Sequence, residues 1–353
     1  MKIIHTADLH LGSKMEIRLD NKKATKRKNE LLLSFENLIE KAVLYDAKVI
    51  IIAGDLFDVK DVNAKTKDYL LGLFTKHSNI DFIYVSGNHD EVNFLSQIEL
   101  PSNVKMCSNE WTTYNYDDVE ITGINYNSYT DKFLYDTLNI DHNKKNIVVL
   151  HGQVATSNQP DIINLKKLAN KGIDYLALGH IHSYKIDKLD DRGIYAYSGC
   201  LEGRGFDEIG EKGFLLIDTE DIKKPKFIPN SKRIIHQLDI DITNYNNWLD
   251  IDRLIDDRIK SISSNDMVLI KLTGQYDVSL IKQTEILSQK LNENFFFAKI
   301  KDESKLLINI DDYKSEISLK AEFIRNVINS DLKDIEKERV IEYGLKALIG
   351  EEL

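Results

Sequence analysis

Seven side chains of types that commonly bind metals follow short apolar runs in the first half of the chain. They are Asp8, His10, Asp55, Asn88, His151, His180 and His182. None is a thiolate, so the set suits Mn²⁺, Fe or Zn²⁺ and argues against a structural zinc site built from cysteines. A pair of such ions, roughly 3.5–4 Å apart, can clamp a phosphoryl group and lower the pKa of a shared water to about 7. The residue types therefore predict phosphoester hydrolysis, with Asp55 as the carboxylate that bridges the two ions.

The apolar runs predict the strands that position these side chains. They lie at residues 3–4, 49–53, 82–85, 147–150 and 175–178. Aliphatic and β-branched residues without polar alternation are typical of strands buried on both faces in α/β sheets. Functional groups of such sheets collect beyond the carboxyl ends of the strands. We therefore expect an α/β fold whose strand ends bring the seven side chains to one edge.

The motifs, taken in order, resemble a known superfamily. Asp8-Leu9-His10, Gly54-Asp55, Gly87-Asn88-His89-Asp90, His151 and Gly179-His180-Ile181-His182 are similar in order and spacing to the five motifs of the calcineurin-like metallophosphoesterases. Residues 5–12 and 53–58 resemble more narrowly the SbcD DNA-repair exonucleases, bacterial relatives of the meiotic-recombination nuclease of eukaryotes and archaea. Residues 198–204 and 208–213 look most like the YhaO branch. The resemblance is strong over residues 1–220.

This resemblance implies two metal sites and a catalytic acid. One ion would be held by Asp8, His10, Asp55 and His182, and the other by Asp55, Asn88, His151 and His180. His89 would stabilise the developing charge or protonate the leaving oxygen, and Asp90 would orient the His89 imidazole. Mn²⁺ is the expected metal, with Fe and Zn²⁺ as alternatives. The chain departs from the eukaryal and archaeal branch at Asp58, where that branch has a histidine, so a role in turning the phosphate does not transfer.

Two further residues lie close to the motifs. His5 is inside the first predicted strand, and we expect a hydrogen-bonded core residue rather than a ligand. Arg204 lies in a glycine-rich turn just past a strand. Both a contact with a substrate phosphate and a salt bridge within the turn remain open for it.

The composition is that of an intracellular enzyme. The chain has 353 residues, of which 42% are hydrophobic, enough for a sizeable core. Its two cysteines, Cys107 and Cys200, are too few for a disulfide framework and predict a reducing compartment. The N-terminus shows no signal-peptide hydrophobic region, and no apolar run approaches the roughly 20 residues that span a bilayer. We expect a cytoplasmic protein without a membrane partner.

The net charge of −10 conceals a basic stretch beside the first motif. Between positions 14 and 28, seven basic residues minus two acidic residues give a local charge of +5. Nucleic-acid binding depends on local charge, so this stretch predicts a DNA-backbone contact. The candidate contacts are Lys22, Lys23, Lys26, Arg27 and Lys28. The alternative is a solvated loop that leads into a helix at about residues 28–45.

Three parts are expected along the chain. Residues 1–230 form the metallophosphoesterase domain, which the resemblance implies is a four-layer α/β/β/α sandwich. Residues 231–305 predict a small β-α-β-α-β capping domain, with helices at about 251–262 and 279–291. Residues 306–353 predict a tail of two amphipathic helices, at about 318–328 and 332–349, which either packs on its own domain or docks on another protein. The resemblance implies that this partner is an SbcC-like coiled-coil ABC-type ATPase, since the chain itself has no P-loop.

These features together predict a dinuclear-metal phosphodiesterase that acts as a DNA exonuclease or endonuclease in repair. A nucleotide or cyclic-nucleotide phosphodiesterase of the same superfamily is the first alternative, and it would need a small closed pocket rather than an open groove. A scaffold that places the ATPase on DNA without catalysis is the second. The complete ligand set argues against the scaffold. The sequence leaves open whether the protein forms a homodimer.

Overall fold

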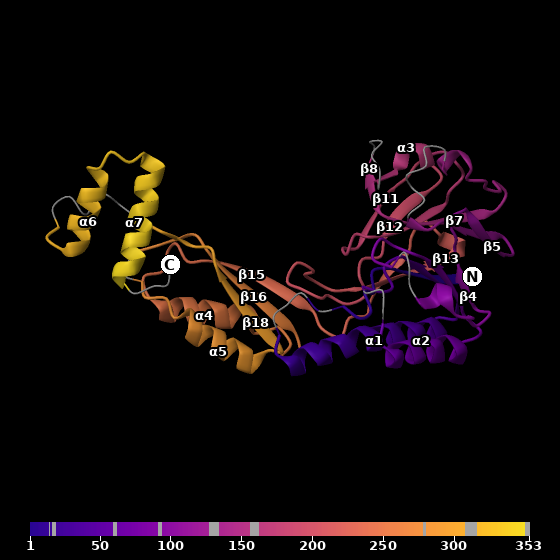
Figure 1. Ribbon diagram of the computed structural model, residues 1–353, viewed down its shortest axis with the longest axis horizontal. Coiled ribbons are helices and arrows are strands. Elements are labelled where there is room, and N and C mark those ends of the chain that lie inside the picture. Colours follow the sequence, from indigo (N-terminus) through magenta and orange to yellow (C-terminus); the bar gives the residue numbers. More distant parts are fainter. Residues whose placement is uncertain are drawn as a thin grey trace. The chain divides into compact units, whose positions relative to one another are not determined.

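The protein is described here from a computed structural model, which covers residues 1–13, 15, 19–58, 62–90, 94–126, 134–155, 162–277, 280–307 and 316–349. Contacts within the chain divide it into two compact units, Met1–Ile235 and His236–Leu353. Figure 1 gives the elements of both units, which are treated separately below.

The first sheet of the N-terminal unit has six strands. Their order is β14 (Lys226–Pro229), β13 (Gly213–Asp218), β1 (Lys2–Thr6), β2 (Ala47–Ala53), β3 (Asp81–Val85) and β4 (Val104–Met106). Strands β1 to β4 are parallel, whereas β13 and β14 are antiparallel to their neighbours. Helices α1 (Asn21–Leu44) and α2 (Ala64–Lys76) cover the outer face, where Phe35 and Phe74 pack on Phe82 (Figure 1).

A second six-stranded sheet packs on the inner face of the first. Its order is β11 (Lys185–Lys188), β12 (Ile194–Tyr197), β10 (Tyr175–Gly179), β7 (Lys145–His151), β6 (Val119–Gly123) and β5 (Thr112–Tyr116). Ile51 and Ile83 of the first sheet share a buried cluster with Val149 and Ala177 of the second. The outer face of the second sheet is covered by α3 (Leu165–Leu168), η3 (Leu134–Asp136) and the segments around them. The predicted α/β class and its layered sandwich are therefore confirmed, although the outer layer on this side is mostly irregular over the residues that the structure describes.

Short elements complete this unit. They are η1 (Phe94–Gln97), β8 (Gln153–Ala155), β9 (Ile162–Asn164) and η4 (Thr219–Asp221).

The five strands predicted from the apolar runs are β1, β2, β3, β7 and β10. Strands β1, β2 and β3 run parallel in one sheet, and β7 and β10 run parallel in the other. Their last residues pair within each sheet, with Ala53 opposite Val85 and Gly179 opposite His151. The motif residues that follow therefore emerge at one edge of the sandwich, as the sequence predicted.

Helix α1 begins earlier than predicted. The carboxylate of Asp20 accepts a hydrogen bond from the Lys23 amide at 2.8 Å, which is the usual N-cap geometry. The described part of the basic stretch, Lys22 to Lys28, is therefore helical rather than a loop. Lys14 and Arg18 lie outside the described residues. The early start was missed because these turns carry charged side chains with no apolar periodicity.

Strands and helices alternate in the first part of the second unit, and two consecutive helices end it. Its elements are β15 (Ile235–Asp241), α4 (Trp248–Ile259), β16 (Met267–Thr273), β17 (Gln275–Tyr276), α5 (Thr284–Asn294), β18 (Phe297–Asp302), β19 (Lys305–Leu306), α6 (Leu319–Ile328) and α7 (Asp334–Ile349). The main sheet has the order β15-β16-β18. Helix α5 begins at Thr284, five residues later than the predicted start at position 279, which lies outside the described residues.

The two tail helices share the hydrophobic core of this second unit. Ile324 of α6 and Ile341 and Leu345 of α7 belong to the same buried cluster as Val268 and Leu291. Within the described residues, no helix is both long enough and apolar enough to cross a membrane.

His5 is a buried core residue, which confirms the prediction for it. Its Nε2 lies 3.2 Å from the carbonyl oxygen of Leu178, and its Nδ1 lies 2.9 Å from the hydroxyl of Tyr175. Because a carbonyl can only accept, Nε2 carries the proton and Nδ1 accepts from the tyrosine. Burial lowers the pKa of His5 to about 3, so the folded protein keeps this imidazole neutral.

This buried histidine predicts acid sensitivity. The unfolded chain binds a proton at His5 below about pH 6.5 and the folded chain does not, so stability is lost as pH falls from 6.5 toward 3. The free energy of unfolding should drop by about 2 kcal/mol between pH 7 and pH 5 from this residue alone. Urea unfolding of metal-free protein at both pH values measures the drop. It should shrink in His5→Gln and persist in His142→Gln, which changes an exposed histidine. Equal drops in wild type and His5→Gln would contradict the assignment.

Candidate metal centre

The structure brings all seven predicted ligands together at the strand ends. Ligand atoms of Asp8, His10 and His182 lie within 4.8 Å of one another, and so do those of Asp8, Asp55 and His151. The side-chain oxygen of Asn88 lies 2.9 Å from Nε2 of His151 and 3.2 Å from Nδ1 of His180. These contacts join residues that follow five different strands.

The predicted ligands other than Asp55 form two groups, the first with Asp8, His10 and His182 and the second with Asn88, His151 and His180. Asp55 lies between these two groups. Its Oδ2 atom is 3.7 Å from Nε2 of His10 and 3.4 Å from Nε2 of His151. Burial alone would raise the pKa of Asp55, but its hydrogen bond with His151 and the nearby imidazoles hold that pKa well below the ordinary value. A carboxylate that stays ionised and faces both groups has the placement that a bridging ligand requires.

The first group has a donor set that fits a cation. Nδ1 of His10 lies 3.1 Å from a carboxylate oxygen of Asp58, and Nδ1 of His182 lies 2.6 Å from one of Glu208. Each carboxylate accepts the Nδ1 proton, which leaves a lone pair on each Nε2 atom. These two Nε2 atoms lie 3.2 Å apart. Two lone pairs that face each other at this distance are stabilised by a shared positive ion.

The second group follows the same logic. Nδ1 of His151 donates to the carbonyl oxygen of Ala53 at 2.9 Å, so its Nε2 is left with a lone pair. That atom faces the oxygens of Asn88 and Asp55, which are also acceptors. Burial lowers the pKa of His151, but the hydrogen bond and charge of Asp55 outweigh it and raise this pKa to about 9, so a second proton binds at Nε2 when no metal ion does. The site therefore attracts positive charge strongly.

Unusual backbone conformations make this convergence possible. Four of the predicted ligands have a left-handed backbone: Asp8 (φ 55°), His10 (φ 47°), Asp55 (φ 52°) and His180 (φ 94°). This conformation costs about 1–2 kcal/mol for a residue with a Cβ atom and is concentrated at functional sites. Gly54 also has positive φ, at 90°, and a Cβ atom there would collide with the His151 ring.

The predicted acid, His89, lies beside His10 of the first group. Its side chain is 47% exposed, and its Nδ1 atom lies 3.4 Å from the Asp58 carboxylate. Its backbone amide donates to Oδ1 of Asp55 at 3.0 Å. Asp58 therefore lies beside both the predicted acid His89 and the predicted ligand His10. Burial raises the pKa of Asp58, but the hydrogen bond that His10 donates outweighs it and keeps this pKa below the ordinary value.

Asp90 was predicted to orient His89, and in the structure its carboxylate binds backbone amides and a tyrosine. It accepts hydrogen bonds from the amides of Leu56, Phe57 and Gly87 and from the hydroxyl of Tyr84. Asp90 therefore ties the loop after β3 to the loop after β2. The carboxylate that lies beside the imidazole nitrogen of His89 is Asp58.

Glu208 was missed by the sequence analysis. It contacts His182 across 26 positions of the chain, and no spacing rule connects the two residues. Burial alone would raise the pKa of Glu208, but the His182 hydrogen bond and the Arg204 charge lower it to about 2. The signal available was its place in the segment that resembles the YhaO branch.

The basic residues divide into buried and exposed groups. Arg204 is only 6% exposed and pairs with Glu208, which favours the salt-bridge interpretation. Arg27 is 1% exposed and pairs with Glu30 and Glu202, so the prediction that it contacts DNA is wrong. The remaining residues of the stretch are Lys22, Lys26 and Lys28, which are exposed, and Lys23, which is half-buried.

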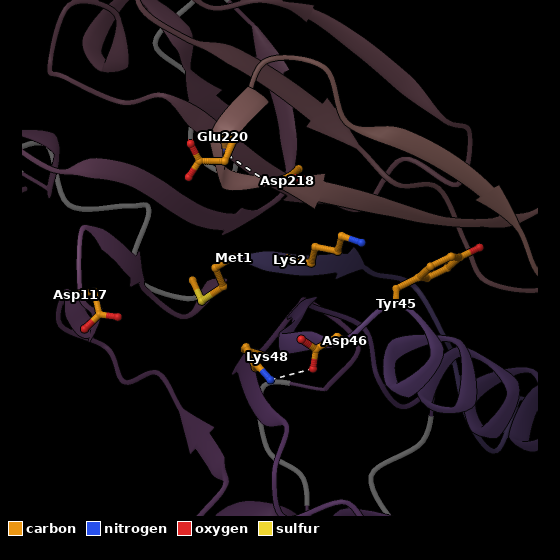
Figure 2. A pocket seen from close by; sticks show the side chains of 8 residues that line it. All are labelled: Met1, Lys2, Tyr45, Asp46, Lys48, Asp117, Asp218 and Glu220. Carbon is orange, nitrogen blue, oxygen red and sulfur yellow. Dashed lines mark hydrogen bonds and ion pairs between the residues drawn. The ribbon is translucent and has the colours of Figure 1, made fainter.

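A surface hollow of about 540 Å³ lies at the end of the sheets where β1 and β2 begin, and Figure 2 shows the side chains that line it. Its lining is Met1, Lys2, Tyr45, Asp46, Lys48, Asp117, Asp218 and Glu220. Lys2 and Lys48 lie near the starts of β1 and β2, whereas the predicted metal ligands follow the ends of these strands. This hollow is therefore separate from the metal centre.

The chain belongs to the calcineurin-like phosphoesterase family, whose sequence model matches residues 1–184. Among known proteins it is similar to the DNA double-strand break repair protein Mre11 of Nanoarchaeum equitans (strain Kin4-M). The two are 27% identical over 89% of this chain and 90% of that protein. The predicted enzyme class, a metal-dependent phosphoesterase, and the resemblance to DNA-repair nucleases are confirmed by these matches.

Two solved structures are similar at a lower level. TT1561 of Thermus thermophilus has a TM-score of 0.44 and 13% identity, over 65% of this chain and 98% of that one. A dimetal phosphatase from Danio rerio has a TM-score of 0.41 and 11% identity, over 61% of this chain and 91% of that one.

Substitutions should separate the predicted ligand Asp55 from the predicted acid His89. Asp55→Asn should reduce metal binding and activity together, because one carboxylate faces both groups. His89→Asn should leave both ions bound but lower the rate roughly 10²–10⁴-fold, the usual contribution of a positioned acid. Titration calorimetry with Mn²⁺ and hydrolysis of a chromogenic phosphodiester measure the two effects. Full two-ion occupancy in Asp55→Asn, or loss of an ion in His89→Asn, would reverse the corresponding assignment.

Proposed function

We propose that this protein is a two-metal DNA nuclease that acts in repair, with Mn²⁺ as the metal. The observation that carries the proposal is that seven predicted ligands and the partly exposed imidazole of His89 lie together where strands of both sheets end. The similarity to the archaeal Mre11 protein over most of both chains supports DNA as the substrate. The buried carboxylates and imidazoles also argue against a scaffold without catalysis, which would have no need of them.

The proposed ligand sets follow the two groups of side chains. Asp8, His10, Asp55 and His182 would hold one ion, and Asp55, Asn88, His151 and His180 the other. When bound, such a pair polarises the phosphoryl oxygens and lowers the pKa of a shared water. The side chain that would transfer a proton in this reaction is the His89 imidazole. When this ring carries a proton on both nitrogens, Nδ1 faces the Asp58 carboxylate and Nε2 can give its proton to the leaving oxygen.

The first turns of α1 are the proposed DNA-backbone contact. Lys22, Lys26 and Lys28 are exposed there. Arg27 fixes this part of the helix to the loop that leads into Arg204, because its guanidinium donates to Glu202 and to the carbonyl oxygen of Gly203. The exposed lysines are thus held on a helix that is tied to a loop of the metal centre. Their charge offsets the overall negative charge where a phosphate backbone would lie.

The function can be tested with substrates and a matched pair of variants. The protein with Mn²⁺ should cleave duplex or single-stranded DNA faster than cyclic nucleotides. Replacing Lys22, Lys26 and Lys28 with glutamine should weaken DNA binding and flatten its salt dependence, because fewer counterions are released. Hydrolysis of a small chromogenic phosphodiester should be unchanged.

Glutamine at Lys223, Lys224 and Lys226 is the matched control, since it removes three exposed lysines elsewhere in the same unit. It should leave the salt dependence as in wild type. Faster cleavage of cyclic nucleotides than of DNA would refute the nuclease proposal. Equal salt slopes for the two triple variants would refute the proposed contact on α1.

The tail is the proposed binding segment for an SbcC-like coiled-coil ATPase, in a cytoplasmic complex. Several apolar side chains of α7 are exposed, including Ile335 (69%) and Tyr343 (53%). Others of the same helix, Ile341 and Leu345, are buried in the core of the second unit. Helix α7 therefore has one face that stabilises its own unit and another that is open to a partner helix.

Substitution on the two faces should have opposite effects. Ile335→Ser with Tyr343→Ser should leave thermal stability unchanged but abolish ATP-stimulated cleavage of duplex DNA by the protein mixed with an SbcC-like ATPase. Ile341→Ser should instead destabilise the second unit by about 2–4 kcal/mol, because it removes a buried side chain and leaves a cavity with a polar group. Normal ATP stimulation in the double variant would remove the exposed face from the interface.

A further inference from the structure

The two histidines that face each other in the first group are supported in the same way. Nδ1 of His10 is held by Asp58, and Nδ1 of His182 is held by Glu208. Each carboxylate fixes the tautomer of its histidine, so that Nε2 carries the lone pair. Both carboxylates are largely or fully withdrawn from solvent.

One guanidinium lies between these two carboxylates. Nη2 and Nε of Arg204 donate to Oε1 of Glu208 at 2.9 and 3.2 Å, and Nη1 lies 3.6 Å from Oδ1 of Asp58. The Arg204 side chain is 6% exposed, so it is mostly shielded from a substrate. The planar fork of an arginine can meet two carboxylates in fixed directions, which a lysine ammonium cannot do.

We infer that Arg204 is a positioning residue that links the carboxylate supports of His10 and His182, and so sets the affinity of one of the two metal sites. The inference rests on the two-metal centre of the proposed function but not on the identity of the substrate. It gives Arg204 a role distinct from contact with a substrate phosphate. It also connects the first metal site to His89, because Asp58 lies beside the acid as well.

The segment around Arg204 supports this role. The amide of Cys200 donates to the carbonyl oxygen of His182 at 3.3 Å, and the ammonium of Lys212 donates to the same oxygen at 3.0 Å. The amide of Arg204 itself donates to Glu208. Residues 200–212 therefore hold both the backbone and the ring of His182.

Calorimetry with Mn²⁺ on the metal-free full-length protein tests the inference. Wild type should bind two ions. Arg204→Met should weaken one of the two sites by about 10–100-fold, the usual effect of losing a support behind a ligand, and leave the other nearly unchanged. Electron paramagnetic resonance at two equivalents of Mn²⁺ should show the signal of a spin-coupled pair in wild type and a reduced signal in the variant. At saturating Mn²⁺, the KM for a small phosphodiester should not change.

Arg192→Met is the matched control, because Arg192 pairs with Asp174 near the start of β10, away from the ligands. It should bind both ions as wild type does. Arg204→Lys keeps the charge without the fork and should still weaken the same site, which gives a comparison if Arg204→Met does not fold.

Three outcomes would overturn the inference. Wild-type affinity at both sites in both Arg204 variants would do so alone. A raised KM with both affinities intact would assign Arg204 to the substrate phosphate instead. Fewer than two ions bound by wild type would overturn the proposed function together with this inference.

Discussion

The mutual repulsion of ligand atoms at one sheet edge is the constraint on which the rest of the N-terminal unit depends. Nε2 of His10 and Nε2 of His182 face each other at 3.2 Å, and Nε2 of His151 faces two oxygens. Their Nδ1 atoms are held by acceptors, so these lone pairs cannot turn away without breaking buried hydrogen bonds. These acceptors therefore repel one another unless a proton or a metal ion lies between them, and the site gains free energy when a metal ion is bound.

Two rigid sheets hold these acceptors in place. The parallel strands of each sheet end on the same side of the sandwich. The apolar residues between the two sheets hold these strand ends close to one another. Left-handed backbone at Asp8, His10 and Asp55 then turns each chain sharply as it leaves its strand. Glycine at position 54 lets the His151 ring approach the first sheet closely. The strain is local, and the buried cores on both faces of each sheet offset it.

Much of this arrangement could be predicted from the sequence, because it follows from short-range patterns. Unbroken apolar runs identify buried strands, and parallel strands bring the residues after them to one edge. The supports behind the ligands could not be predicted in this way. The contact of Glu208 with His182 depends on the path of an irregular loop. The pairing of Asp58 with both His10 and His89 depends on side-chain packing rather than on periodicity. Arg27 misled the prediction because a buried arginine and an exposed one look the same in a charged stretch.

A second network of buried charges explains why Arg27 is not on the surface. Arg27 and Arg233 both pair with Glu30, and Arg27 also pairs with Glu202. A buried ion pair contributes little net stability, because desolvation of its charges cancels most of the attraction. Such pairs instead specify one arrangement of the chain, because each guanidinium has all its partners only when α1 and the loop at Glu202 lie in that arrangement. That loop continues directly into Arg204 and Glu208. The pairs that Arg27 makes therefore fix the loop from which Arg204 and Glu208 reach the predicted ligands, although none of these charged residues is itself a predicted ligand. We expect substitutions at Glu30 or Glu202 to act on the metal centre through the position of this loop.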